Sequence, residues 1–112
     1  MKRKKLIRDE VAKGLPSYKV ATIESQDELN QLYVMKVKEE LAEVVNSDFK
    51  DITEFADLLH VVVCFSRANG HPLENLLSAM SVKQRERGLF SNKVLTDINP
   101  LNESNKIYTE ES

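Results

Sequence analysis

Two acid-x-x-acid pairs are the residues of this sequence best suited to chemistry. The first pair is Glu40 with Glu43, and the second is Glu54 with Asp57. Like charges three residues apart on a helix repel each other, so two such pairs facing apolar surroundings call for a compensating partner. Carboxylate oxygens are hard ligands that suit Mg²⁺ or Mn²⁺, with waters and phosphate oxygens completing the octahedron. If the two helices are antiparallel, the pairs predict one divalent metal site.

Ordinary salt bridges are the alternative explanation for these acids. Lys36, Lys38 and Arg67 lie on the same predicted helices and could supply the cations. Ion-pair networks imitate functional clusters of carboxylates. The residue types and their spacing leave both explanations open.

Basic residues continue the apolar stripe of the last predicted helix. Apolar residues between positions 73 and 80 recur at helical spacing, and Lys83 and Arg87 follow on the same stripe. From there they could reach a phosphate held at the acids. Basic residues are also favourable at a helix C-terminus without any ligand, and that explanation is sufficient by itself.

Three helices are expected to position these residues. The first covers about 25–46, because Ser25 opens a capping box. The second covers about 51–69, with an aspartate at its start and Gly70 as its stop. The third covers about 72–88, with a proline in its first turn. The fold class predicted is therefore all-α.

The remaining segments are expected to lack helices. Residues 18–23 should be extended or irregular, and residues 90–98 should form a short extended segment. The basic run 2–5 is interpreted as a solvated terminal tail, and the polar tail 99–112 as loosely ordered.

Helical periodicity separates two adjacent glutamates of the first helix. Its apolar arc runs from Tyr33 to Val44, and Glu40 lies at the edge of this arc, with Glu43 beside it. Glu39 lies farther round, toward the polar face. We therefore expect Glu40 and, less directly, Glu43 to point toward a packed interface.

The second helix is apolar around most of its circumference. Glu54 and Asp57 fall in its apolar sector, not on the narrow polar strip around His60 and Arg67. We expect this helix to be buried on nearly every side. Two neighbouring helices cannot cover it all, so a partner chain should complete a small bundle of three main helices.

Length and composition bound the class of protein. The chain has 112 residues, the size of one domain (1–112), and its net charge of −2 gives no general reason to bind nucleic acid or membranes. It shows neither an apolar run near the roughly 18 residues of a membrane span nor a signal peptide. Its single cysteine, Cys64, is interpreted as a small core residue and favours a reducing compartment. We expect a soluble, cytoplasmic protein.

Three blocks of the sequence match motifs of a known enzyme superfamily. Residues 5–9 read Lys-Leu-Ile-Arg-Asp, close to a Lys-Leu-Val-Arg-Asp signature. Residues 36–43 and then 54–57 match a metal motif, and residues 87–90 fit Arg-Gly-x-Phe. In these blocks the chain resembles the MazG-like, all-α nucleotide pyrophosphohydrolases, in their predicted house-cleaning branch. It departs from that branch at residues 10–12, where Glu-Val-Ala replaces the usual Lys-Ile-Pro.

The resemblance implies an enzyme that hydrolyses nucleoside triphosphates to a monophosphate and pyrophosphate, clears noncanonical nucleotides, and works as a homodimer or homotetramer. It implies that Mg²⁺ is held by Glu40, Glu43, Glu54 and Asp57. The general base would be Glu40 or Glu43. Phosphate contacts are implied for Lys36, Arg8, Lys83 and Arg87.

Two residues beside these ligands are candidates for supporting roles. His60 follows Asp57 by three positions and could contact it, although a lone histidine on a polar strip is more often structural. Glu39 could orient a water or a second metal.

Two other functions compete with this one. A phosphoribosyl-ATP pyrophosphohydrolase uses related carboxylates, but the first and last blocks favour the house-cleaning branch. A helical interaction module with the same fold and no activity would have no reason to keep four acids in apolar sectors.

Overall fold

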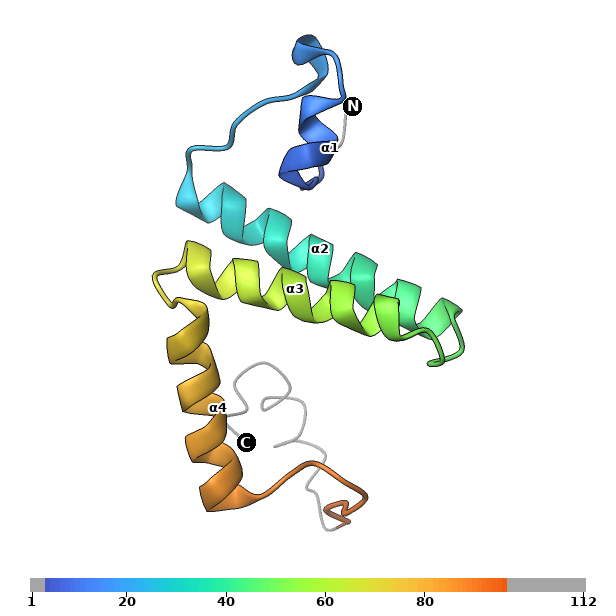
Figure 1. Ribbon diagram of the computed structural model, residues 1–112, viewed down its shortest axis with the longest axis vertical. Coiled ribbons are helices and arrows are strands. Elements are labelled where there is room, and N and C mark those ends of the chain that lie inside the picture. The colour runs from blue at the N-terminus through green and yellow to red at the C-terminus, as the bar shows by residue number, and fades with distance from the viewer. Residues whose placement is uncertain (1–3, 97–112) are drawn as a thin grey trace. The chain divides into compact units, whose positions relative to one another are not determined.

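The structure is a computed structural model that describes residues 4–96. The chain divides into two compact units, Met1–Met80 and Ser81–Ser112, which are described separately. Every regular element among the described residues is helical, which confirms the all-α prediction (Figure 1). The elements are α1 (Asp9–Lys13), the short 3₁₀ helix η1 (Ser17–Lys19), α2 (Gln26–Asn46), α3 (Ile52–Ala68) and α4 (Leu73–Arg87).

The three main helices begin and end within one residue of the predicted positions, because local capping signals fix them. The Ser25 Oγ accepts a hydrogen bond of 3.2 Å from the Glu28 backbone N–H at the start of α2. Asp51 caps α3 by accepting hydrogen bonds from the backbone N–H and hydroxyl of Thr53, and these bonds lower the pKa of Asp51. Gly70, at φ +88°, follows α3 in the left-handed conformation that glycine favours.

A tight turn folds α2 and α3 into an antiparallel hairpin (Figure 1). Within residues 4–96 they are the only two helices whose backbones pack against each other. The turn places two non-glycine residues, Asp48 and Phe49, in the left-handed region at φ 58° and 62°. That conformation is costly for phenylalanine, so packing of the hairpin must hold it in place.

The hairpin core is small. Val44 and Leu32 are its buried apolar residues, with 2% and 7% exposure. The rings of Tyr33 in α2 and Phe65 in α3 stack with their centroids 5.0 Å apart. Burial raises the pKa of the Tyr33 hydroxyl.

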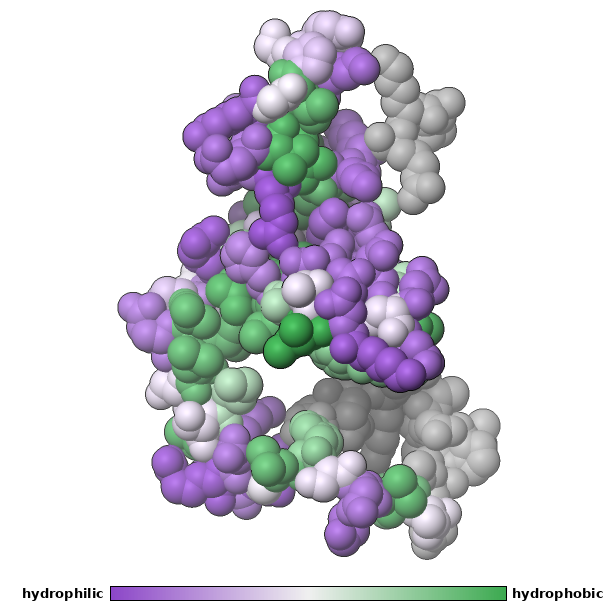
Figure 2. All heavy atoms as spheres, turned by 45° about the vertical axis from the view of Figure 1, so that its right-hand side comes forward, coloured by the Kyte–Doolittle hydropathy of each residue, from purple (hydrophilic) through white to green (hydrophobic). Residues whose placement is uncertain are grey.

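The single chain leaves much apolar surface uncovered (Figure 2). No residue of α3 is buried within one chain, and Leu59 is 61% exposed, so the chain by itself does not enclose this helix. Cys64, expected in the core, is a partly exposed free thiol. None of the described helices is both long and apolar enough to cross a membrane.

Three segments differ from the sequence expectation or lie outside the described residues. The helix α1 was not predicted; its acidic first turn and the Glu10–Lys13 ion pair of 2.8 Å stabilise it. Residues 90–96 form neither helix nor strand, and residues 97–98 of the expected extended segment are outside the described range. The predicted loose tail 99–112 is outside it too.

Candidate metal and phosphate site

The hairpin brings the two acid pairs within electrostatic reach of each other. Partial burial raises the pKa of Glu54, and the negative charges of Glu43, Asp51, Asp57 and Glu40 raise it further. Glu43 and Glu40 act on Glu54 from the facing helix. The hairpin therefore places Glu40, Glu43 and Asp57 within electrostatic range of Glu54.

The four acids differ in exposure. The Glu40 side chain is only 13% exposed, in agreement with its place at the edge of the apolar arc. Glu54 and Asp57 are half-buried. Glu43 is exposed, so the expectation that it points into a packed interface is wrong. An exposed carboxylate at this position is open to a ligand that approaches from solvent.

Arg8, predicted to bind phosphate, contacts a predicted metal ligand. It lies in the extended segment just before α1, and its Nη2 donates to the Asp57 Oδ1 at 2.9 Å. Its Nη1 lies 2.9 Å from the Nδ1 of His60. Because a guanidinium only donates, this ring nitrogen accepts. His60 and Asp57 therefore hold one arginine between them, so the expectation that Asp57 lies apart from the polar strip around His60 is wrong.

Lys36 of α2 lies close to two acids of its own helix. Its Nζ lies 2.9 Å from the Glu39 Oε2 and 3.6 Å from the Glu40 Oε2. Lys5 approaches the same Glu39 oxygen at 3.5 Å. The hydrogen bond from Lys36 is the main cause of the lowered pKa of Glu39, and Lys5 adds to it.

The salt-bridge explanation accounts for half of the acids. Lys36 and Arg8 pair with Glu40 and Asp57, whereas Lys38 and Arg67, the other proposed cations, form no ion pair within residues 4–96. None of the described residues pairs with Glu43 or Glu54. Two of the four carboxylates thus have no ion pair with a cation of the described residues.

The donor set fits Mg²⁺ without forming a closed cage. Among the residues described, no three His, Cys, Asp or Glu side chains are arranged to hold a metal ion by themselves. Mg²⁺ is usually bound by one or two carboxylates, with waters and substrate phosphates supplying the other oxygens. Glu43 and Glu54 match that requirement, with Glu40 and Asp57 as their neighbours.

Two basic residues predicted to be a solvated tail are fixed in ion pairs. Lys4 lies 2.8 Å from Glu28 and Lys5 lies 3.5 Å from Glu39, while both lysine side chains stay exposed, at 63% and 65%. Lys5 opens the first motif block, which was the available signal. Lys83 and Arg87 belong to the second compact unit, and their phosphate contacts stay a prediction.

No protein-family model, curated protein or solved structure matches the chain. The functional assignment is therefore carried by the geometry and motifs of the chain's own residues.

Proposed function

We propose that this chain is a Mg²⁺-dependent nucleoside triphosphate pyrophosphohydrolase that releases a monophosphate and pyrophosphate and clears noncanonical nucleotides. The proposal is supported by the charges of Glu40 and Glu43, which act on Glu54 across the α2–α3 hairpin, and by the lack of an ion pair for Glu43 and Glu54 within the described residues. Arg8 and Lys36 stand beside the other two acids and supply positive charge for phosphates. The motif resemblance supports this substrate class.

Glu40 and Glu43 differ in how available they are to act as the general base in this reaction. A bound divalent ion would offset phosphate charge and lower the pKa of a coordinated water. Glu43 is exposed and has no ion pair among the described residues, so its oxygens are free to orient the attacking water or accept its proton. Glu40 is held by Lys36 and is the less available of the two candidate bases.

The basic residues act on the leaving group. Negative charge develops on the pyrophosphate as the α–β anhydride bond breaks, and positioned cations stabilise it. Arg8 is 54% exposed and can turn from Asp57 to a phosphate, because its ion pair is at the surface.

The test is pyrophosphate release from standard, modified and phosphoribosyl nucleotides, with and without Mg²⁺. We expect Mg²⁺-dependent release from nucleoside triphosphates. Release from phosphoribosyl-ATP alone would identify the related histidine-pathway activity instead. No release from any member of the panel would favour the non-catalytic interaction module.

We also propose that the active form is a homodimer or homotetramer that buries the outer face of α3. Ile52, Phe55, Leu59 and Val62 are 79%, 46%, 61% and 38% exposed. Their spacing of three and four residues forms one apolar stripe, of the kind that packs against another helix. A second copy of this chain offers a matching stripe.

Sedimentation at micromolar concentration tests the assembly. Leu59→Glu should give a monomer, because it places a charge in the middle of the stripe. Leu89→Glu is the matched control, since Leu89 is also exposed, at 72%, and lies outside the hairpin. A compact wild-type monomer would contradict the proposed assembly and leave the hydrolysis to be tested by itself.

A further inference from the structure

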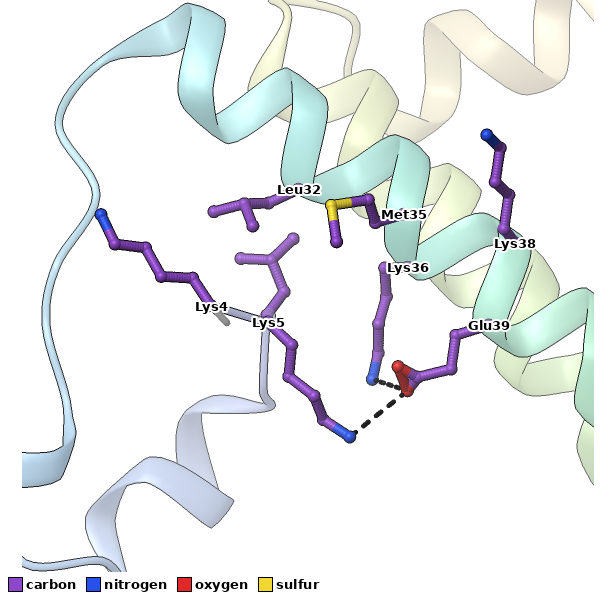
Figure 3. A pocket seen from close by; sticks show the side chains of 8 residues that line it. Lys4, Lys5, Leu32, Met35, Lys36, Lys38 and Glu39 are labelled. Carbon is purple, nitrogen blue, oxygen red and sulfur yellow. Dashed lines mark hydrogen bonds and ion pairs between the residues drawn. The ribbon is translucent and has the colours of Figure 1, made fainter. Parts of the chain in front are cut away.

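A cavity of about 600 Å³ lies between the N-terminal segment and α2 (Figure 3). Its volume falls within the range of small-molecule sites, roughly 300–1,000 Å³. It is lined by two kinds of residue, three apolar side chains and a set of charged ones. The apolar residues are Leu6, Leu32 and Met35, and the charged residues are Lys4, Lys5, Lys36, Lys38 and Glu39.

The apolar part offers a surface for a flat ring. Leu32 is 7% exposed and fixed in the hairpin core, whereas Met35 is 43% exposed and open to a ligand. Both side chains point from α2 toward the N-terminal segment (Figure 3). A methionine thioether is adaptable and packs favourably against aromatic rings.

The charged part joins this cavity to the carboxylates. Lys5 and Lys36 converge on Glu39, while Lys4 and Lys38 extend away from it (Figure 3). Lys36 also reaches Glu40 on the next turn of α2, at 3.6 Å. A chain of phosphates could therefore pass from the cavity along Lys36 to the proposed metal ligands.

We propose that the cavity holds the nucleobase end of the substrate, with the base against Leu32 and Met35 and the phosphates running past Lys36. This assignment rests on the proposed function and adds a base-binding surface to it. The lining has no amide, hydroxyl or imidazole side chain, and the backbone of α2 is hydrogen-bonded within the helix. The lysines and Glu39 are therefore the polar side chains that can meet the edge of the base, and none of them carries the paired donor and acceptor of an amide.

Weak discrimination between bases follows from this lining. A pocket that recognises a substrate by apolar packing separates related substrates by about 10–200-fold, whereas a pocket built around hydrogen bonds separates them by about 10⁴-fold or more. We expect values of kcat/KM for ATP, GTP, CTP and UTP to lie within about 200-fold of one another. A spread in kcat/KM of about 10⁴-fold would overturn the inference that the site discriminates weakly between bases.

Calorimetry in Mg²⁺ with two probes tests the base-binding surface. One probe is ATP with a methylene group in place of the α–β bridging oxygen, and the other is inorganic tripolyphosphate. We expect the nucleotide analogue to bind wild type about tenfold more tightly, because only it has a base to pack. Met35→Ser should reduce this advantage to below about threefold. Val34→Ser is the matched control, since Val34 is the next residue, is also 43% exposed and does not line the cavity, and it should keep the advantage.

The outcomes separate this inference from the proposed function. Equal affinity of wild type for the two probes, or a Met35→Ser variant that keeps the tenfold advantage, would overturn the base-binding surface and leave the phosphate and metal site intact. Failure of wild type to bind either probe would overturn both. Melting curves of the two serine variants confirm that each is folded, and Met35→Ala, with an expected loss of severalfold, gives a second measurement at the same position.

Discussion

Glu39 and Glu54 are glutamates of the same hairpin, and their electrostatic surroundings shift their pKa values in opposite directions. Glu39 lies between Lys36 and Lys5, and these cations lower its pKa. Glu54 lies among carboxylates, and partial burial together with their charges raises its pKa. One carboxylate is satisfied by the protein, and the other still lacks a cation within residues 4–96.

This difference shows how one helix can carry, about one turn apart, an acid paired with lysines and an acid without an ion pair among the described residues. α2 presents Glu39 to the lysines of the N-terminal segment and, about one turn later, Glu43 to Glu54 across the hairpin. A cluster that raises a pKa by like-charge repulsion is a favourable place for an added cation. We expect the two kinds of acid to respond differently to substitution, metal and pH.

The largest contrast is expected in turnover. Glu54→Gln should reduce kcat by orders of magnitude, because it removes charge that holds the metal without changing size. Amide variants of Glu40, Glu43 and Asp57 should behave similarly. Glu39→Gln should keep measurable turnover. Initial rates at saturating Mg²⁺ decide the matter: an inactive Glu39→Gln beside an active Glu40→Gln would show that the assigned helix register is wrong.

Arg8 should matter more for catalysis than for folding. Arg8→Ala should lower kcat/KM by about 10²–10³-fold if the guanidinium stabilises charge on the leaving group. Its surface ion pair with Asp57 should contribute no more than about 1 kcal/mol to the free energy of unfolding. Kinetics and urea unfolding of the same variant give both numbers. Full activity together with a large loss of stability would make Arg8 a structural residue.

Mg²⁺ should stabilise the folded chain through the acids that lack a cation. A ligand at a hundredfold excess over its Kd raises the free energy of unfolding by about 2.7 kcal/mol. Melting temperatures with and without Mg²⁺, in the presence of a nonhydrolysable nucleotide, should show this gain for wild type and Glu39→Gln. The gain should be absent in Glu54→Gln, and its persistence there would remove Glu54 from the site.

The smallest effects concern metal-free stability and its pH dependence. A lowered carboxyl pKa favours folding above the unfolded value and is lost as pH falls through the folded pKa, so Glu39 stabilises the chain at pH 7. The raised pKa of Glu54 favours folding in acid, and this contribution is lost as pH rises through the folded pKa. Glu39→Gln should therefore lower stability at pH 7, by at most about 1 kcal/mol, and Glu54→Gln should raise it.

Urea unfolding in EDTA measures both differences. They should shrink toward about pH 3, where most carboxyl groups are protonated and resemble the amide. Equal and pH-independent changes in the two variants would contradict the assigned environments of Glu39 and Glu54.

The sequence by itself determined the three main helices and placed Glu40 nearer to the packed face of α2 than Glu39. Ser25, Asp51 and Gly70 act on backbone groups a few residues away, and helical periodicity separates Glu39 from Glu40 without reference to the rest of the chain. Such signals are local, so they can be read directly from the order of residues.

Only the tertiary structure decided which acids Arg8 and Lys5 meet. Arg8 contacts Asp57, which is 49 positions away in the sequence. Lys5 of the N-terminal segment contacts Glu39 of α2 in the lining of the cavity. These contacts depend on the path of the N-terminal segment past α2 and α3, which no local periodicity encodes. The same path creates the cavity over Leu32 and Met35. The sequence alone does not give these ion pairs, because the segments that carry the charges lie far apart along the chain and meet only when it folds.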